Sequence, residues 1–208
     1  MKTLIAATIA GAALAAAATA APPTLTLAAS APVVAYGKTV TLTGALSTQQ
    51  ANQNVTIKGT ECGSTKATNA ARVKTTTNGA YTATVKPVVA TTYQAFQKTT
   101  KSNTVVVSVA PVVGLKRVAR GSFNASVTAG LDFKGKTLLF QRYAKLRKRW
   151  VQVKKVTLTS SAPTQRPTII SSASFRAKTP KRARVRLVLT KAQAAPCYAT
   201  AKSNVVRN

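Results

Sequence analysis

The side chains most able to do chemistry in this sequence are cations. Residues 142–156, RYAKLRKRWVQVKKV, carry seven Lys or Arg in fifteen positions, with Tyr143 and Trp150 between them. Cations interleaved with aromatic rings are typical of surfaces that bind polyanions, because the charges attract phosphate or carboxylate and the rings can stack. The same pattern also fits two strands around a turn whose outward face is charged, and both interpretations stay open here.

Acid–base and metal chemistry lack their usual residues. The 208-residue chain has no His, and its two carboxylate side chains, Glu61 and Asp132, stand against 31 Lys plus Arg, for a formal net charge of +29. General acid–base catalysis relies on His or paired carboxylates, and divalent metals need clusters of His, Cys or carboxylate ligands. We therefore expect a protein that is not an enzyme and uses no cofactor or metal.

One segment matches the consensus sequence of a nucleotide-binding motif. Residues 130–137, GLDFKGKT, satisfy the phosphate-loop pattern GxxxxGK[ST]. That loop requires a strand before it and a helix after it, whereas the following LLFQRY alternates like a strand. No second Asp is present to hold Mg²⁺. We interpret the match as a coincidence.

The N-terminus has the layout of a secretory signal. MKTLIAATIAGAALAAAATA has one Lys, then a long run of mostly small apolar residues and an Ala-Thr-Ala end, which predicts a cleavable signal peptide over residues 1–21. The alternative is an uncleaved anchor, for which the Ala-rich run is weakly apolar. We expect a secreted chain with no transmembrane span after cleavage, retained at the cell envelope, if at all, noncovalently.

The rest of the chain repeats one order of short segments. Pro87 matches Pro180, and Ser102-Asn103 matches Ser203-Asn204. Val- and Thr-rich segments that alternate apolar and polar residues and break at Gly, Pro, Asn or Ser predict antiparallel strands. In the first repeat we predict strands at 24–28, 38–44, 53–59, 70–76, 80–86, 91–97 and 103–109. The second repeat begins near 113, with further strands at 122–128, 136–143, 150–159, 172–178, 183–190 and 202–207.

These segments resemble those of bacterial immunoglobulin-like repeat proteins. The likeness is carried by AYGKTVTLTGAL, TNGAYTATVKPVVATTYQAF and SNTVVVSV in the first repeat, and by GKTLLFQRY, RWVQVKKVTL, SASFRAKTP and PCYATAKSN in the second. The resemblance implies an all-β fold of two tandem seven-stranded antiparallel β-sandwiches, with one domain at 22–110 and a strongly basic one at 111–208. Such modules act mostly as spacers, stalks or adhesive surfaces. Tyr93 resembles the tyrosine corner of these sandwiches, and an ordinary core aromatic fits equally well.

The two cysteines lie at different places in the two repeats. Cys62 follows the third predicted strand of the first repeat, and Cys197 lies in the last loop of the second. Because strand direction alternates and the first repeat leads directly into the second, these two loops face each other across the junction. We predict a Cys62–Cys197 disulfide, which export would permit. Two free thiols or an intermolecular bridge are the alternatives.

The basic charge gathers in the second repeat. Residues 22–110 hold eight basic residues and one acid, whereas residues 111–208 hold 22 and one. Strand direction places three turns of the second repeat at the end that points away from the first. We predict a cationic tip there, formed by Arg120, Lys145, Arg147, Lys148, Arg149, Lys181, Arg182 and Arg184.

The position of Trp150 stays open in the sequence. If Val151 and Val153 point inward, alternation places Trp150 on the outer face of its strand, whereas a one-residue bulge would bury it.

Three functions fit the predicted tip. The first is an envelope or surface module that binds an anionic wall polymer or surface glycan by multivalent, salt-sensitive attraction. The second is a passive extracellular spacer whose charged surface maintains solubility. The third is nucleic-acid binding, which we expect to be only non-specific because the protein is predicted to be exported.

Overall fold

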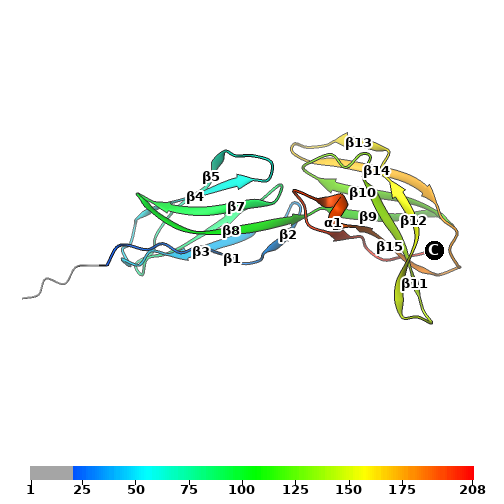
Figure 1. Cartoon of the computed structure of the whole chain (residues 1–208), viewed down its shortest axis with the longest axis horizontal. Coiled ribbons are helices and arrows are strands. Elements are labelled where there is room, and N and C mark those ends of the chain that lie inside the picture. The colour runs from blue at the N-terminus through cyan, green and yellow to red at the C-terminus, as the bar shows by residue number, and fades with distance from the viewer. Residues whose placement is uncertain (1–20) are drawn as a thin grey trace, which may run out of the picture.

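The computed structural model describes residues 21–208, which fold into four β-sheets arranged in an elongated molecule (Figure 1). The predicted signal peptide, residues 1–21, lies outside the described residues except for Ala21. Two of the sheets come from the N-terminal half, residues 21–110, and two from the C-terminal half, residues 111–208. The all-β prediction is therefore confirmed.

Eight strands form the two sheets of the N-terminal half. The three-stranded sheet has the order β1 (Ala28–Ala29), β3 (Val40–Ala45) and β6 (Ala80–Val85). The five-stranded sheet has the order β2 (Val33–Ala35), β8 (Thr100–Ala110), β7 (Thr91–Gln97), β4 (Asn54–Glu61) and β5 (Ala67–Lys74).

Alternation along these strands builds the N-terminal core. In β7 the sequence TTYQAFQ buries every second residue, so that Tyr93 and Ala95 point inward. Leu42 from one sheet and Ile57 and Val107 from the other are fully buried in the same hydrophobic cluster. Tyr93 is thus a core aromatic, 3% exposed.

The C-terminal half contributes a four-stranded and a five-stranded sheet. The four-stranded sheet has the order β13 (Ser160–Pro163), β14 (Ile169–Arg176), β10 (Ser122–Ala129) and β9 (Val112–Ala119). The other sheet has the order β12 (Arg149–Thr157), β11 (Thr137–Ala144), β15 (Arg184–Leu189) and β16 (Ala201–Lys202), and β17 (Val206–Arg207) also pairs with β15.

Three phenylalanines lie at the centre of the C-terminal core. The ring centroids of Phe123 and Phe140 are 5.1 Å apart, and Phe175 lies 5.6 Å from Phe123 and 5.1 Å from Phe140. The Phe123–Phe175 pair is stacked and the other two are tilted or edge-on, and aromatic pairs in these geometries are attractive beyond their buried area. They hold the four-stranded sheet, through β10 and β14, against β11 of the five-stranded sheet.

A Ser-Asn pair fastens the two sheets together in each half. In the N-terminal half, Asn103 accepts a hydrogen bond from Leu27 N (3.0 Å) and donates one to Leu27 O (2.9 Å). In the C-terminal half, Asn204 accepts from Leu115 N and donates to Leu115 O, both at 3.1 Å. The preceding residues, Ser102 and Ser203, each accept a hydrogen bond from a neighbouring strand, at Ala95 N and Leu187 N. The two sequence repeats therefore share a structural device as well as a pattern.

The first predicted strand, 24–28, is wrong in its details. Leu25 forms only an isolated bridge with Leu46, and β1 is limited to two residues. After Pro32, which has no N–H to donate to a sheet, the chain crosses to the other sheet and β2 pairs in parallel with β8. The N-terminal half is therefore not purely antiparallel.

Two elements of the C-terminal half were not predicted, and one prediction was too long. The edge strand β13 and the single helical turn α1 (Lys191–Ala194) are both absent from the predicted strands. The segment predicted as one strand at 202–207 forms two short strands, β16 and β17, on either side of Asn204. The amide of Asn204 bonds to Leu115 in the opposite sheet, which interrupts the pairing with β15 at this point.

Candidate functional site

A disulfide joins the two halves. Cys62 directly follows β4, and Cys197 lies beyond α1; their Cα atoms are 5.3 Å apart and 135 residues separate them in sequence. The predicted pairing is confirmed. A disulfide of this kind persists in an oxidising compartment.

Backbone hydrogen bonds flank the disulfide. Ala90 N donates to Cys197 O at 2.9 Å, and Ala199 N donates to Val109 O at 2.8 Å. Tyr36 Oη lies 3.0 Å from Thr168 Oγ1, which adds a side-chain hydrogen bond between the halves. The covalent link is thus one of several contacts between the halves.

Apolar packing runs continuously across the junction. Val89 and Val109 of the N-terminal half belong to the same buried cluster as the C-terminal core. Gly130 lies against Val88, and a Cβ at Gly130 would overlap Val88 Cγ1. Within the C-terminal half, Tyr198 Oη accepts hydrogen bonds from Gly130 N (3.0 Å) and Leu131 N (3.1 Å), which positions Gly130 at the junction, and burial raises the pKa of this phenol. These contacts fix one half against the other.

The cationic tip begins with the hairpin of β11 and β12, which projects from the far end of the molecule (Figure 1). The hairpin closes with Ala144 opposite Arg149, and Lys148 N donates to Lys145 O at 3.2 Å. Lys148 has a φ of 47°, the left-handed conformation that completes this kind of short turn. The two-stranded hairpin therefore places Lys145, Arg147, Lys148 and Arg149 at its outer end.

A second turn, before β15, lies beside this hairpin. Ala183 N donates to Pro180 O at 3.1 Å, and Arg182 has a φ of 61°. Asn208, 5% exposed, ties this turn to the one before β10. It accepts a hydrogen bond from Gly121 N through Oδ1 (2.8 Å) and from Arg182 N through its backbone oxygen (2.7 Å), and donates to Thr179 O (3.0 Å).

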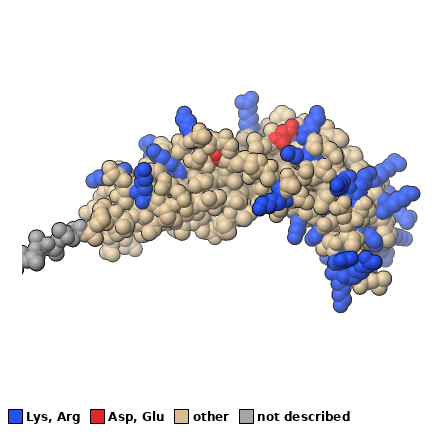
Figure 2. All heavy atoms as spheres, in the orientation of Figure 1, with Lys and Arg blue, Asp and Glu red and all other residues tan. Residues whose placement is uncertain are grey.

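The two turns enclose a cationic hollow of about 680 Å³. Six basic side chains line it, with Tyr143, Leu146, Val151 and Pro180 among the remaining lining residues. The six are Arg142, Lys145, Arg147, Lys181, Arg182 and Arg184. No carboxylate side chain lines it, because none follows Asp132 in the sequence. Figure 2 shows Lys and Arg gathered at this end of the molecule.

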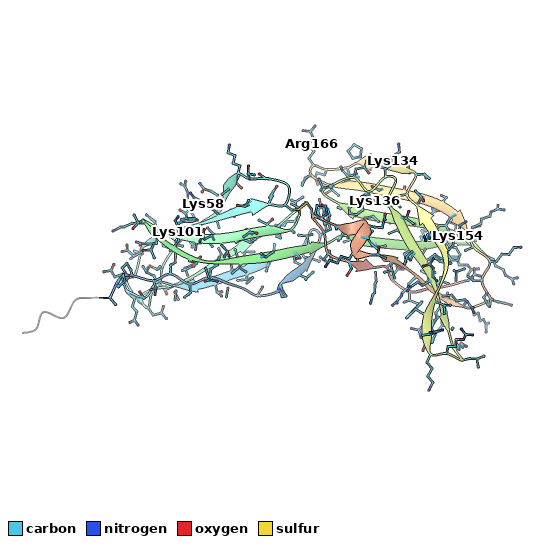
Figure 3. The ribbon with its side chains drawn as sticks, in the orientation of Figure 1. Lys58, Lys101, Lys134, Lys136, Lys154 and Arg166 are labelled. Carbon is cyan, nitrogen blue, oxygen red and sulfur yellow. A yellow bond between two sulfur atoms is a disulfide. The ribbon has the colours of Figure 1, made fainter. Side chains whose placement is uncertain are left out.

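The remaining predicted tip residues lie next to the hollow. Lys148 and Arg149 belong to the hairpin turn but are absent from the lining. Arg120 lines an adjacent hollow that shares Pro180 with the first. Lys154 lies in the sheet, where its Nζ donates to Arg176 O at 3.0 Å, and not in the turn (Figure 3).

Sequence reasoning missed two residues of this end. Arg142 shares the inward face of β11 with Phe140, but near the open end of the sandwich, so that it lines the hollow. Strand alternation could have indicated this orientation. Asn208 ties the turns together through its buried amide and backbone, and no local pattern in the sequence marks that role.

Trp150 lies half-buried on the outer face of β12. Its ring centroid is 5.4 Å from that of Tyr143, its partner across the hairpin, and the Arg186 guanidinium lies 4.1 Å from the Trp150 centroid. A bulge at Val153 lets Gln141 pair with Gln152 while Phe140 pairs with Lys154. Since Val156 and Leu158 are buried, the bulge turns Trp150 outward, the opposite of the effect considered from sequence. The outer face therefore carries two aromatic rings covered by arginines.

The carboxylate of Asp132 is occupied by local hydrogen bonds. Oδ1 accepts from Lys134 N (2.8 Å) and Ser171 Oγ (2.9 Å), and Oδ2 accepts from Ser161 Oγ (2.9 Å). The amide of Lys134 is the main cause that lowers the pKa of Asp132. The loop leads into the strand β11, and the helix that a phosphate loop requires is not formed there.

Residues 21–208 contain no cluster of three or more His, Cys, Asp or Glu that could hold a metal ion. Over the same residues, no helix has the length and apolar character needed to cross a bilayer. No protein-family model and no curated protein matches the chain.

Proposed function

We propose that the protein is a secreted, non-enzymatic module of the cell envelope that binds an anionic surface polymer or glycan through its cationic tip. The observation that carries the proposal is the hollow between the two turns, with six basic side chains and no carboxylate side chain in its lining. Crowded like charges repel one another, so an anion that enters the hollow relieves this repulsion.

A polymer suits this surface better than a single small anion. Lys148, Arg149 and Arg120 extend the positive surface beyond the hollow. Successive charges of a polyanion would contact them in turn, and each contact would release counterions. Binding of this kind is multivalent and weakens as salt increases.

The fold proposed for this module is a tandem of two immunoglobulin-like domains, at 22–110 and 111–208. Three observations support it: each half has its own pair of sheets, each pair encloses a hydrophobic core, and each core is closed by the same Ser-Asn device. Secretion is supported by the predicted signal and by the Cys62–Cys197 disulfide.

The test is fractionation of cells that express the full chain, followed by a wash with moderate salt. The wild-type protein is expected in the envelope fraction and in the salt wash. A variant with four charge reversals in the hairpin turn should move to the medium. The changes are Lys145→Glu, Arg147→Glu, Lys148→Glu and Arg149→Glu. The control variant makes the same change in net charge in the N-terminal half and should stay in the envelope fraction. It carries four substitutions at exposed lysines: Lys38→Glu, Lys66→Glu, Lys74→Glu and Lys98→Glu. Equal retention of both variants would remove the cationic tip from the proposal.

A passive spacer is the second candidate function, favoured by the junction. The disulfide, the flanking hydrogen bonds and the shared apolar cluster join the halves into one elongated body. Such a body holds its ends apart without binding anything at the tip. Wild-type protein found wholly in the medium, before any salt wash, would favour this function.

A further inference from the structure

Leu146 stands at the apex of the β11–β12 hairpin and is 101% exposed. It occupies the first position after Lys145 in the turn that Lys148 closes. The other large apolar residues that are exposed are 39–62% exposed, whether they lie within strands, as Val106 and Val118 do, or in loops, as Leu131 does. An apolar side chain fully in water at the outermost point of a projecting hairpin gains nothing from the fold.

Cations surround this leucine closely. Lys145 and Arg147 are its chain neighbours, and Lys148 and Arg149 complete the turn. The hollow beneath the turn adds further basic side chains, with Leu146 itself in the lining. An exposed leucine surrounded by basic side chains is complementary to an anionic membrane surface, which has negative headgroups outside and hydrocarbon beneath them.

Two aromatic rings lie behind the turn. Tyr143 and Trp150 face each other one residue pair inward from the closing pair of the hairpin. At the usual rise of a strand, they lie about 7–10 Å behind the apex. This spacing is similar to the depth of about 5–10 Å over which interfacial segments enter a membrane, where Trp and Tyr are favoured.

We propose that the β11–β12 hairpin docks on an anionic lipid bilayer, with Leu146 inserted below the headgroups and the cations of the turn bound to lipid phosphates. The inference rests on the proposed function for the charge of the cationic tip and goes beyond it by assigning the tip a second kind of anionic surface, a lipid bilayer. A hydrated polymer offers Leu146 no apolar environment, whereas a bilayer does. Burial of one leucine strengthens binding by about tenfold or more.

The experiment measures binding of the full-length, oxidised protein to lipid vesicles and to a soluble polyanion. Cosedimentation is compared for vesicles of phosphatidylglycerol with phosphatidylcholine and for phosphatidylcholine alone. Inorganic polyphosphate serves as the soluble polyanion. Leu146→Ser is the test variant, and Val118→Ser, at a residue 62% exposed on β9, is the matched control. Emission of Trp150, the single tryptophan, reports contact of the hairpin with lipid.

The proposal expects the wild-type protein and Val118→Ser to bind the anionic vesicles equally, with a blue shift of the Trp150 emission. Leu146→Ser should bind these vesicles about tenfold more weakly while its affinity for polyphosphate stays unchanged. Equal binding of Leu146→Ser to the vesicles would overturn insertion and leave the anion-binding function intact. Absence of wild-type binding to both vesicles and polyphosphate would reject the proposed function as well.

Discussion

The side-chain amide of Asn204 closes a ring of two hydrogen bonds with the backbone of Leu115, donating to its oxygen and accepting from its nitrogen, both at 3.1 Å. Asn204 stands between the short strands of one sheet, and Leu115 belongs to β9 of the other. The amide thus acts as a strand partner across the two layers. Asn103 makes the same ring with Leu27 in the N-terminal half.

Asn204→Ala is expected to lower the free energy of unfolding of the C-terminal half by about 1–3 kcal/mol, because the Leu115 N–H and C=O lose their partners where access to water is restricted. Chemical denaturation followed by Trp150 fluorescence measures this half. Asn69→Ala, at an exposed position of β5, is the control and should leave the transition unchanged. An equal transition in both variants would show that the ring contributes nothing to stability.

Reduction of the Cys62–Cys197 disulfide is expected to lower the melting temperature. The bond closes a loop of 135 residues, and the entropy of loop closure for this length corresponds to about 5 kcal/mol. The measurement is thermal unfolding with and without reductant. The double variant Cys62→Ser, Cys197→Ser should melt like the reduced wild type and respond to reductant no further. A wild-type curve insensitive to reductant would contradict the prediction.

Gly130→Ala is expected to destabilise the junction by about 1–3 kcal/mol, because the added Cβ overlaps Val88 Cγ1 and the Val88 side chain must move. The double variant Gly130→Ala, Val88→Ala removes the overlapping methyl and should recover part of the loss. Denaturation of the four members of this cycle gives the coupling energy. If the changes in unfolding free energy of the two single variants simply add up in the double variant, residues 88 and 130 are not in contact.

The loop at Asp132 is expected to loosen in acid. Its hydrogen bonds hold the pKa of Asp132 below its ordinary value in the folded protein. The stabilisation is therefore fully present above the pKa of an unfolded Asp, about 3.9, and is lost as pH falls through the lower folded value. The protection factors of the Phe133 and Lys134 amides, which compare their exchange rates with those of an unfolded chain at the same pH, should fall over this range. Asp132→Asn should raise exchange at neutral pH and remove most of the pH dependence.

Strands with strict alternation and clear breaks were predictable from sequence. The segment 91–97 matches β7 to the residue, and 80–86 matches β6 within one. The Cys62–Cys197 bond was predicted from strand direction, because successive strands alternate in direction and this decides which loops lie at the same end of a half. The turns that enclose the hollow were brought together by the same argument.

Features that depend on tertiary contacts were not predictable. Pairing of β2 with β8 depends on a change of sheet after Pro32, and the outward position of Trp150 depends on one extra residue, Val153, in the β12 register. Asn208 joins turns at positions 121, 179 and 182 through contacts that no local periodicity encodes. In each case, a partner distant in sequence overrides the local pattern.

The place of the disulfide has a mechanical consequence. If the molecule is pulled from its two ends, tension passes along residues 21–62, crosses the sulfur bridge and continues along residues 197–208. The 135-residue separation lies in a closed loop outside that path, so the cationic hairpin bears no load while the bond is intact. Reduction would place the hairpin itself in the path of the force.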